Sequence, residues 1–404
     1  MTVPAPVPAP APAGDPAAAI VERCRALVAD LTFAAVRRWK EEHPGRLAVG
    51  HLPVYVPRPL LEAQGCLPVA LFGGGDELEI VRGDSYFQSY ICHLPRSMVE
   101  LERRGCLDVL DGVLFPSLCD VVRNLGGMWN LLAPERWTAY VDLPQNFDPE
   151  VGGVFYAAEM RRIAGELTAR GAWPLDDDRL GAALADEDRR RAALGRLDEL
   201  RRREPWRVPA SDAYLVTRAG GLMTAAEHTA LVDEYAAAAA GRAARPQDNV
   251  RVVVAGAFCE QPPLALIRTL EKAGCYIVDD DFQLGLKTIE GDVSPSGGDD
   301  PLAALARAFL ERGAATASRY LADGVKGAHL VDRVAAAGAD GVVFAASSFC
   351  DPALLDQPML ETALDRAGIP YTSLKYSENT AQFQTIREQA GAFSDSVKLW
   401  GKSA

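Results

Sequence analysis

The feature that most constrains the fold is an alternation of short apolar runs, bounded by glycine and proline, with amphipathic segments of helix length. This alternation is typical of parallel sheets whose strands are joined by helices. It predicts an α/β protein with two doubly wound, Rossmann-like parallel-sheet domains. Seven runs have the character of buried strands: Leu67–Phe72, Gly112–Phe115, Thr138–Leu143, Arg251–Ala255, Cys275–Val278, Gly341–Ala345 and Ile369–Leu374.

The alternation is interrupted between the third and fourth of these runs by charge-rich helical sequence. We therefore expect a first helix and α/β domain over residues 17–150, a helical insert over 151–247 and a second α/β domain over 248–404. The first helix is predicted to run from Ala17 to about Lys40. Residues 1–16 contain six prolines, too many for a helix or a central strand, so they are expected to form a disordered or polyproline-like arm.

The two halves carry similar short segments. Residues 111–120 read DGVLFPSLCD and residues 340–351 read DGVVFAASSFCD, so each has Asp-Gly, a buried strand, a short loop and Cys-Asp. This similarity suggests a duplicated domain. Chance convergence on a common strand-to-helix turn is the alternative.

Composition excludes several classes of function. A net charge of −13 over 404 residues repels phosphate backbones and anionic membrane surfaces, which argues against nucleic acid as a partner. No apolar run approaches the ~20 residues of a membrane span, and no secretory signal is apparent, so we expect a cytoplasmic protein. The sequence lacks G-x-x-x-x-G-K-[ST] and a helix-opening G-x-G-x-x-G, which predicts no ATP or NAD site on this chain.

Four of the eight cysteines are predicted to face one edge of the sheets. Cys119, Cys259 and Cys350 directly follow predicted strands, and Cys92 lies on the longer connection after Phe72. Ligands of parallel sheets collect beyond the carboxyl ends of the strands, so this edge is the expected site. The other four cysteines are expected to be small buried residues, three of them at the opposite edge: Cys24, Cys66, Cys106 and Cys275.

The spacing of these cysteines leaves open whether they bind a metal. No C-x-x-C pair is present, so any ligation has to be assembled from distant loops. Thiolates in a cytoplasmic protein favour zinc or an iron–sulfur cluster. The acidic run Asp279–Asp281 is a second cation candidate, although a solvated strand end is the favoured interpretation.

Five longer segments resemble the benzoyl-CoA reductase and 2-hydroxyacyl-CoA dehydratase family, and within it the C-type (gamma) subunits of ATP-dependent reductases. They are GDSYFQSYICHLPRSMVEL, DGVLFPSLCDVVRNLGGMW, GAFCEQPPLALIRTLEKAGCYIVDDDFQLGL, FAASSFCDPALLDQPML and YSENTAQFQTIREQAGAFSDSVKLWG. The resemblance runs from about Ala17 to Gly401. It implies a subunit that carries a [4Fe–4S] cluster and takes part in reducing benzoyl-CoA to cyclohexa-1,5-diene-1-carbonyl-CoA during anaerobic aromatic degradation.

The resemblance also implies site residues and partners. The family's cluster cysteines match Cys92, Cys119 and Cys350, while Cys259 is either a fourth thiolate or a neighbour. The implied partners are a paralogous core subunit, an ATP-hydrolysing iron–sulfur subunit pair and reduced ferredoxin as the upstream donor. A 2-hydroxyacyl-CoA dehydratase subunit and a non-catalytic scaffold or assembly protein are the alternatives. The catalytic residues stay open; polar candidates for proton transfer are Glu260, Tyr371, Tyr376, Glu378 and Arg387.

Overall fold

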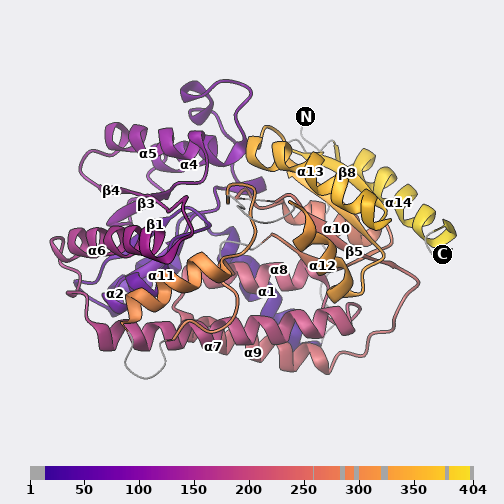
Figure 1. Ribbon diagram of the computed structural model, residues 1–404, viewed down its shortest axis with the longest axis horizontal. Helices are drawn as coiled ribbons and strands as arrows, with labels where there is room; N and C mark the ends of the chain where they lie inside the picture. The colour runs from indigo at the N-terminus through magenta and orange to yellow at the C-terminus, as the bar shows by residue number, and fades with distance from the viewer. Residues whose placement is uncertain are drawn as a thin grey trace.

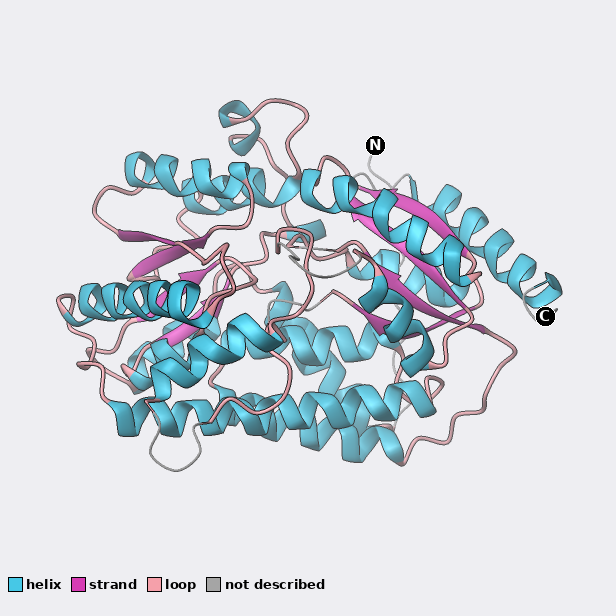
Figure 2. Cartoon of the chain, in the orientation of Figure 1, coloured by secondary structure: helices cyan, strands magenta, loops and turns pink. Residues whose placement is uncertain are grey.

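Two four-stranded parallel sheets form the framework of the protein (Figure 2). The computed structural model describes residues 14–257, 259–282, 287–294, 300–319, 326–377 and 382–400. The first sheet has the strand order β2-β1-β3-β4 and comprises β1 (Ala48–His51), β2 (Leu67–Ala70), β3 (Gly112–Pro116) and β4 (Trp137–Val141). The second has the order β6-β5-β7-β8 and comprises β5 (Val250–Ala255), β6 (Cys275–Asp280), β7 (Gly341–Ser347) and β8 (Tyr371–Tyr376).

The predicted fold class is confirmed, and each of the seven expected strands is present within a few residues of its expected bounds. The strand that sequence reasoning missed is β1, the second strand in spatial order. It is only four residues long and contains Gly50 and His51, which weaken its strand signal. Gly50 is required by close packing, because a Cβ there would lie 2.8 Å from Cδ1 of Leu71 and of Leu110.

Equivalent strand orders support the duplication suggested by the sequence. In both sheets the third strand along the chain lies beside the first, and the second lies on the other side of the first. The two similar segments occupy the same place, because β3 leads to Cys119 and β7 leads to Cys350. The connections therefore diverge between β1 and β3 and between β5 and β7, which are the switch points where ligands of such sheets bind.

Fourteen α-helices surround the sheets within the described residues (Figure 1). Those of the first half are α1 (Pro16–Ala29), α2 (Ala34–Glu42), α3 (Arg58–Ala63), α4 (His93–Arg103) and α5 (Asp120–Leu132). The middle segment forms α6 (Val154–Thr168), α7 (Asp177–Arg203), α8 (Ala210–Ala219) and α9 (Ala225–Ala240). The second half contributes α10 (Leu264–Lys272), α11 (Pro301–Arg312), α12 (Ala328–Ala337), α13 (Asp351–Ala367) and α14 (Phe383–Trp400).

The first predicted helix is interrupted, so the prediction of a single helix from Ala17 to about Lys40 was wrong. Asp30 accepts hydrogen bonds from the backbone N–H groups of Thr32 and Ala34, and Phe33 has a left-handed φ of 55°. An aspartate side chain that bonds the following backbone in this way ends one helix and starts another. Residues 1–13 of the expected proline-rich arm lie outside the described residues, and Pro16 is already helical.

The long helix α7 lies beneath both sheets beside α9 (Figure 1). Asp176 caps its first turn through the Arg179 N–H, and three arginines occupy its last turn, so charges at both ends suit the helix dipole. Apolar side chains of α1, α7, α8 and α9 form a separate core there. The segment expected to be a helical insert is thus helical, while the expected domain boundaries stay a prediction.

The two halves share a core near the centre of the molecule. Helix α11, from the second half, packs against the first half, where the rings of Phe309 and Tyr55 meet edge to face with 5.9 Å between their centroids. Cys259 and Cys350 belong to the same apolar cluster as the first sheet. The carboxyl-terminal loops of the second sheet are therefore held against those of the first.

Candidate functional site

Three of the four cysteines that were predicted to face one sheet edge lie directly before the first residue of a helix. Cys92 is the N-cap of α4, Cys119 of α5 and Cys350 of α13. The N-terminus of a helix carries a partial positive charge and unsatisfied N–H groups, which favour an anionic group. Each of these three thiols therefore stands where the backbone can stabilise a thiolate.

The fourth, Cys259, joins them. It lies on the loop after β5, and its thiol is hydrogen-bonded to Cys350. This contact is the main cause that lowers the pKa of Cys350 and raises that of Cys259. Charges on Cys92 and Cys119 also raise the pKa of Cys259. The structure thus brings together all four cysteines that the sequence placed at one sheet edge.

Burial determines the state of the other two thiols. Desolvation raises the pKa of Cys92 and of Cys119, and for Cys119 the N–H groups of Val122 and Val121 act in the opposite direction. Cys92 is buried and Cys119 half-buried. Both are therefore neutral thiols in the metal-free protein, and a metal has to displace their protons to bind.

The cysteines do not converge as the ligands of one ion do. Among the described residues, no group of three or more histidine, cysteine, aspartate or glutamate side chains is placed to hold a single metal ion. In an iron–sulfur cluster the thiolates are distributed over several irons, so their sulfur atoms do not have to meet at one point.

The remaining cysteines occupy the places expected for them. Cys66 precedes β2 and Cys275 begins β6, so both lie at the amino ends of strands, and Cys24 is buried in α1. Cys106, before β3, is half-buried and was expected to be fully buried. Burial raises the pKa of Cys66 and of Cys275 to about 12, which keeps them as thiols.

The acidic run at the end of β6 is neither solvated nor a cation site. Asp279 is buried and accepts from Arg333 Nε at 3.0 Å, and Asp280 forms an ion pair with Arg201. Asp281 accepts the backbone N–H groups of residues 256 and 257 at 2.7 and 3.1 Å. The interpretation as a solvated strand end was wrong, because internal cations and N–H donors use all three carboxylates.

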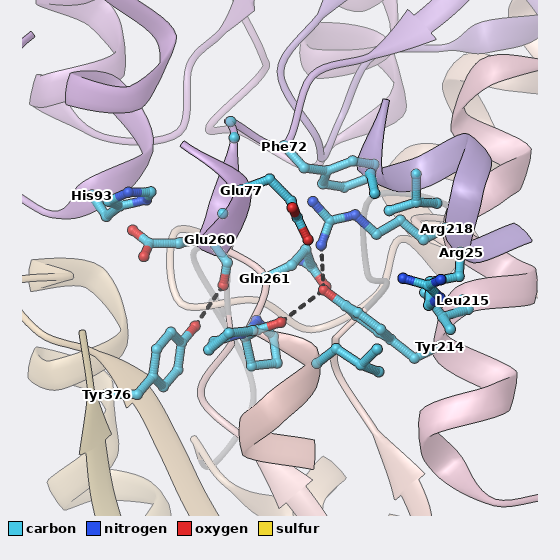
Figure 3. Close-up of a pocket in the computed structure, with 18 of the residues that line it drawn as sticks. Arg25, Phe72, Glu77, His93, Tyr214, Leu215, Arg218, Glu260, Gln261 and Tyr376 are labelled. Carbon is cyan, nitrogen blue, oxygen red and sulfur yellow. Dashed lines mark hydrogen bonds between the residues drawn. The ribbon is translucent and has the colours of Figure 1, made fainter. Parts of the chain in front are cut away.

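A pocket that is partly open to solvent adjoins the loops that carry Cys92 and Cys259 (Figure 3). His93 and Glu260, which follow Cys92 and Cys259 in the chain, line one end of it. Glu260 accepts the Leu94 N–H at 3.1 Å, and the Tyr376 hydroxyl donates to the Glu260 carbonyl at 2.8 Å. This end of the pocket is therefore fixed to the cysteine loops themselves.

The other end of the pocket is lined by arginines, by aromatic rings and by the Glu77 carboxylate (Figure 3). The Arg218 guanidinium lies over the Phe72 ring at 4.8 Å and donates to the Tyr214 hydroxyl at 2.5 Å. Arg25 also lines this end. Sequence reasoning missed Arg218 and Tyr214, because α8 belongs to the helical segment, where no local pattern marks a pocket residue.

The remaining polar candidates fall into two groups. Glu260 and Tyr376 line the pocket. Tyr371 begins β8 at the opposite strand end, and Arg387 is exposed on α14. Glu378 lies outside the described residues.

Within the part of the chain that the structure describes, no helix is long and apolar enough to cross a membrane.

Comparisons with known proteins agree on one family. The family model for the D-component of 2-hydroxyglutaryl-CoA dehydratase matches residues 53–397. The C-type subunit of benzoyl-CoA reductase from Thauera aromatica is 46% identical over 94% of this chain and 98% of that protein. The β subunit of (R)-2-hydroxyglutaryl-CoA dehydratase from Acidaminococcus fermentans is 27% identical, over 89% and 94%. The β subunit of (R)-phenyllactyl-CoA dehydratase from Clostridium sporogenes is 25% identical, over 88% and 93%.

Proposed function

Since the chain belongs to the family of benzoyl-CoA reductase and 2-hydroxyacyl-CoA dehydratase subunits, we propose that it is the C-type core subunit of an ATP-dependent benzoyl-CoA reductase. The observation that carries this choice is the difference in identity, 46% to the reductase subunit against 25–27% to the dehydratase subunits at similar coverage. The family itself was anticipated from the sequence and is confirmed.

The proposed cofactor is a [4Fe–4S] cluster bound by Cys92, Cys119 and Cys350. Three features support the fit: these thiols share one region with Cys259, three helix N-termini meet there, and the site lies between the two sheets. The N-termini would offset the negative charge of thiolate-bound iron. When bound, such a cluster supplies one-electron transfer at low potential.

Cys259 has two possible roles in this proposal. The hydrogen bond to Cys350 places it close enough to be a fourth thiolate or, if it does not bind iron, a donor to the sulfur of Cys350. Hydrogen bonds to cluster sulfurs raise the reduction potential. Cysteine variants separate these two roles.

The reaction needs a site that excludes water and places an aromatic thioester beside an electron source. Adding an electron to a benzene ring removes its aromatic stabilisation, so the charge that develops has to be delocalised into the thioester and trapped by a proton. The pocket beside the cysteine loops offers the aromatic rings of Phe72 and Tyr214 together with the polar groups of Glu260 and Tyr376. We propose that the product is cyclohexa-1,5-diene-1-carbonyl-CoA.

The proposal includes partners. A paralogous core subunit would complete the site, an ATP-hydrolysing iron–sulfur pair would deliver electrons, and reduced ferredoxin would supply that pair. The relatives that match this chain are themselves named as subunits, which supports an assembly of several chains. The proposed location is the cytoplasm.

The second candidate is a 2-hydroxyacyl-CoA dehydratase subunit, favoured by the family model and by the β subunits that match. Anaerobic co-purification of the chain with its neighbouring subunits, followed by assays of both thioester classes, distinguishes the two. We expect ATP-dependent consumption of benzoyl-CoA and no dehydration of 2-hydroxyacyl-CoA. The reverse result would assign the chain to the dehydratases, and a colourless, iron-free complex would favour a scaffold.

Cysteine variants test the cluster assignment residue by residue. Serine at position 92, 119 or 350 should remove most of the bound iron, because a hydroxyl is a poor substitute for a thiolate ligand. The matched control is Cys275→Ser, which changes a buried thiol at the opposite sheet edge and should leave iron and the electron resonance signal intact. Cys259→Ser should lower the iron content if Cys259 is a ligand and shift only the signal if it is a neighbour. Full iron retention at positions 92, 119 and 350 would refute the assignment.

A further inference from the structure

A second pocket, partly open to solvent, lies at the amino edge of the second sheet. It is bounded by the start of β6, by the segment that leads from α9 into β5, and by the turn between α7 and α8. The candidate site lies at the opposite edge, where the carboxyl ends of the strands meet. The lining of this second pocket therefore needs an explanation of its own.

Aromatic rings and prolines line this second pocket. The rings of Trp206 and Tyr276 are tilted by 60° with 6.3 Å between their centroids, and Pro205 and Pro209 lie on either side of Trp206 in the sequence. The Tyr276 hydroxyl accepts the backbone N–H of Gln247 at 2.7 Å, which holds its ring in place. Grooves lined by aromatic rings are the sites at which proteins bind proline-rich segments in the polyproline II conformation.

The polar groups of the second pocket suit the same ligand. A polyproline II segment makes no internal hydrogen bonds, so its carbonyls need donors, and proline itself has no N–H to donate. The pocket offers donors in the Trp206 indole, the Arg245 guanidinium and the Asn249 amide. The Glu271 carboxylate, which also lines it, already accepts the Ser211 N–H at 3.1 Å. An uncharged segment with proline rings and free carbonyls matches this lining.

The chain itself carries such a segment. Proline alternates with alanine or valine over residues 4–13, and residues 1–13 contain no charged side chain. These residues, called the proline arm below, lie outside the described residues. Because proline fixes its own φ and restricts the residue before it, a segment of this composition favours polyproline II and loses little conformational entropy when it binds.

The first described residues anchor the proline arm beside the second pocket. Asp15 accepts from Arg242 Nε at 3.0 Å, and the same guanidinium donates to the Arg207 carbonyl at 2.9 Å. Arg207 directly follows Trp206, so one guanidinium links the start of the described chain to a wall of the pocket. Gly14 is exposed and has a left-handed φ of 116°, which lets the chain turn directly before this anchor.

We propose that residues 4–12 dock in the second pocket as a polyproline II segment, with proline rings held against Trp206 and Tyr276. At about 3.1 Å per residue, these residues extend from about 9 Å to about 34 Å beyond Asp15, enough to enter the pocket from the anchor. The tether gives the arm a high effective concentration at the pocket, so a contact of modest affinity is occupied. This inference is independent of the proposed function, because the pocket lies at the sheet edge opposite the cysteines.

Cleavage by a proline-specific endopeptidase tests the docking in the intact chain, purified with its neighbouring subunits. The protease cuts the arm only while the arm is undocked, so the rate at which the arm is lost, followed by mass, reports the undocked fraction. Trp206→Leu removes one of the two rings and should raise this rate roughly tenfold. The matched control is Trp173→Leu, which changes a partly exposed tryptophan outside the pocket and should leave the rate unchanged.

A peptide tests the unsubstituted pocket directly. A fluorescent peptide with the sequence of residues 1–14 should bind a chain that lacks residues 2–13, as measured by fluorescence anisotropy. The same peptide built from D-residues has the same composition and the same apolar area but forms a helix of the opposite hand, so it should not bind. The comparison of the two peptides requires no substitution in the pocket, and it decides the matter if Trp206→Leu does not fold.

Three results would overturn the inference. The first is an equal rate of arm cleavage in the wild type and in Trp206→Leu, and the second is equal binding of the two peptides. The third is a cleavage rate that rises when the complex is diluted, because it would assign the pocket to the arm of a second copy.

Discussion

Glu100 fixes the loop that leads to Cys92, and replacing it by glutamine should release that loop. Its carboxylate is 1% exposed, and Oε2 accepts three backbone N–H groups, those of residues 81–83, at 3.0, 2.6 and 2.9 Å. Oε1 accepts from Arg104 Nε at 2.7 Å. In Glu100→Gln an NH2 group replaces one of the two carboxylate oxygens. This group faces N–H donors, so at least one of the contacts becomes repulsive.

The pKa of Glu100 gives the magnitude. Desolvation raises this pKa, but the backbone N–H groups and Arg104 together lower it from the ordinary value of 4.5 to about 2. At 1.36 kcal/mol for each pKa unit, the charged form contributes about 3 kcal/mol. Because the folded pKa is the lower one, this contribution is fully present above about pH 4.5 and is lost as the pH falls towards 2.

Amide hydrogen exchange measures the contribution of Glu100 at the backbone N–H groups that it binds, those of residues 81–83. In a chain of this size unfolding need not be two-state, whereas exchange reports the local opening of residues 81–83. We expect their protection in Glu100→Gln to fall by roughly a hundredfold at pH 7, which corresponds to about 3 kcal/mol. Glu22→Gln, which changes an exposed carboxylate paired with Arg25, is the control and should alter little. Unchanged protection of residues 81–83 would show that the carboxylate does not fix the loop.

Two further predictions concern the rest of the chain. The isolated subunit should neither bind nor hydrolyse ATP, as measured by nucleotide binding and phosphate release, because its sequence lacks a phosphate-binding loop; ATPase activity of the pure chain would contradict the proposed division of labour. Tyr55→Phe should lower the hydrogen-exchange protection around Thr316 by roughly fivefold, which corresponds to about 1 kcal/mol, because the Tyr55 hydroxyl bonds Thr316 and Ser318 and so joins the two halves. Iron content should stay unchanged in that variant, and a loss of iron would show that this contact also shapes the cysteine region.

How far the sequence predicts the fold depends on how local each signal is. The strands β3 and β7 were predicted because their apolar runs are continuous and bounded by Asp-Gly. The strand β1 was missed because four residues with a glycine and a histidine give no periodicity, and its place is set by its neighbours β2 and β3. The end of α1 at Ala29 was missed because it depends on hydrogen bonds from Asp30 rather than on hydrophobic spacing.

The candidate site also has some features that a local sequence pattern predicts and others that it does not. Strand ends in a parallel sheet share one edge, so the shared region of Cys92, Cys119, Cys259 and Cys350 could be predicted without knowing how the sheets pack. The positions of Tyr214 and Arg218 could not, because they depend on how α8 and the loop after β5 meet across the molecule.

The four cysteines of the candidate site come from both halves of the chain. Cys92 and Cys119 belong to the first half, and Cys259 and Cys350 to the second, so a group bound by all of them would join the two halves directly. Protein contacts also join the halves, through α11 and the contact of Tyr55 with Thr316. A bound cluster would add its binding free energy to these contacts, because a ligand that binds only the folded arrangement stabilises that arrangement. Loss of the cluster should accordingly loosen the loops around the pocket first and leave the two sheets folded.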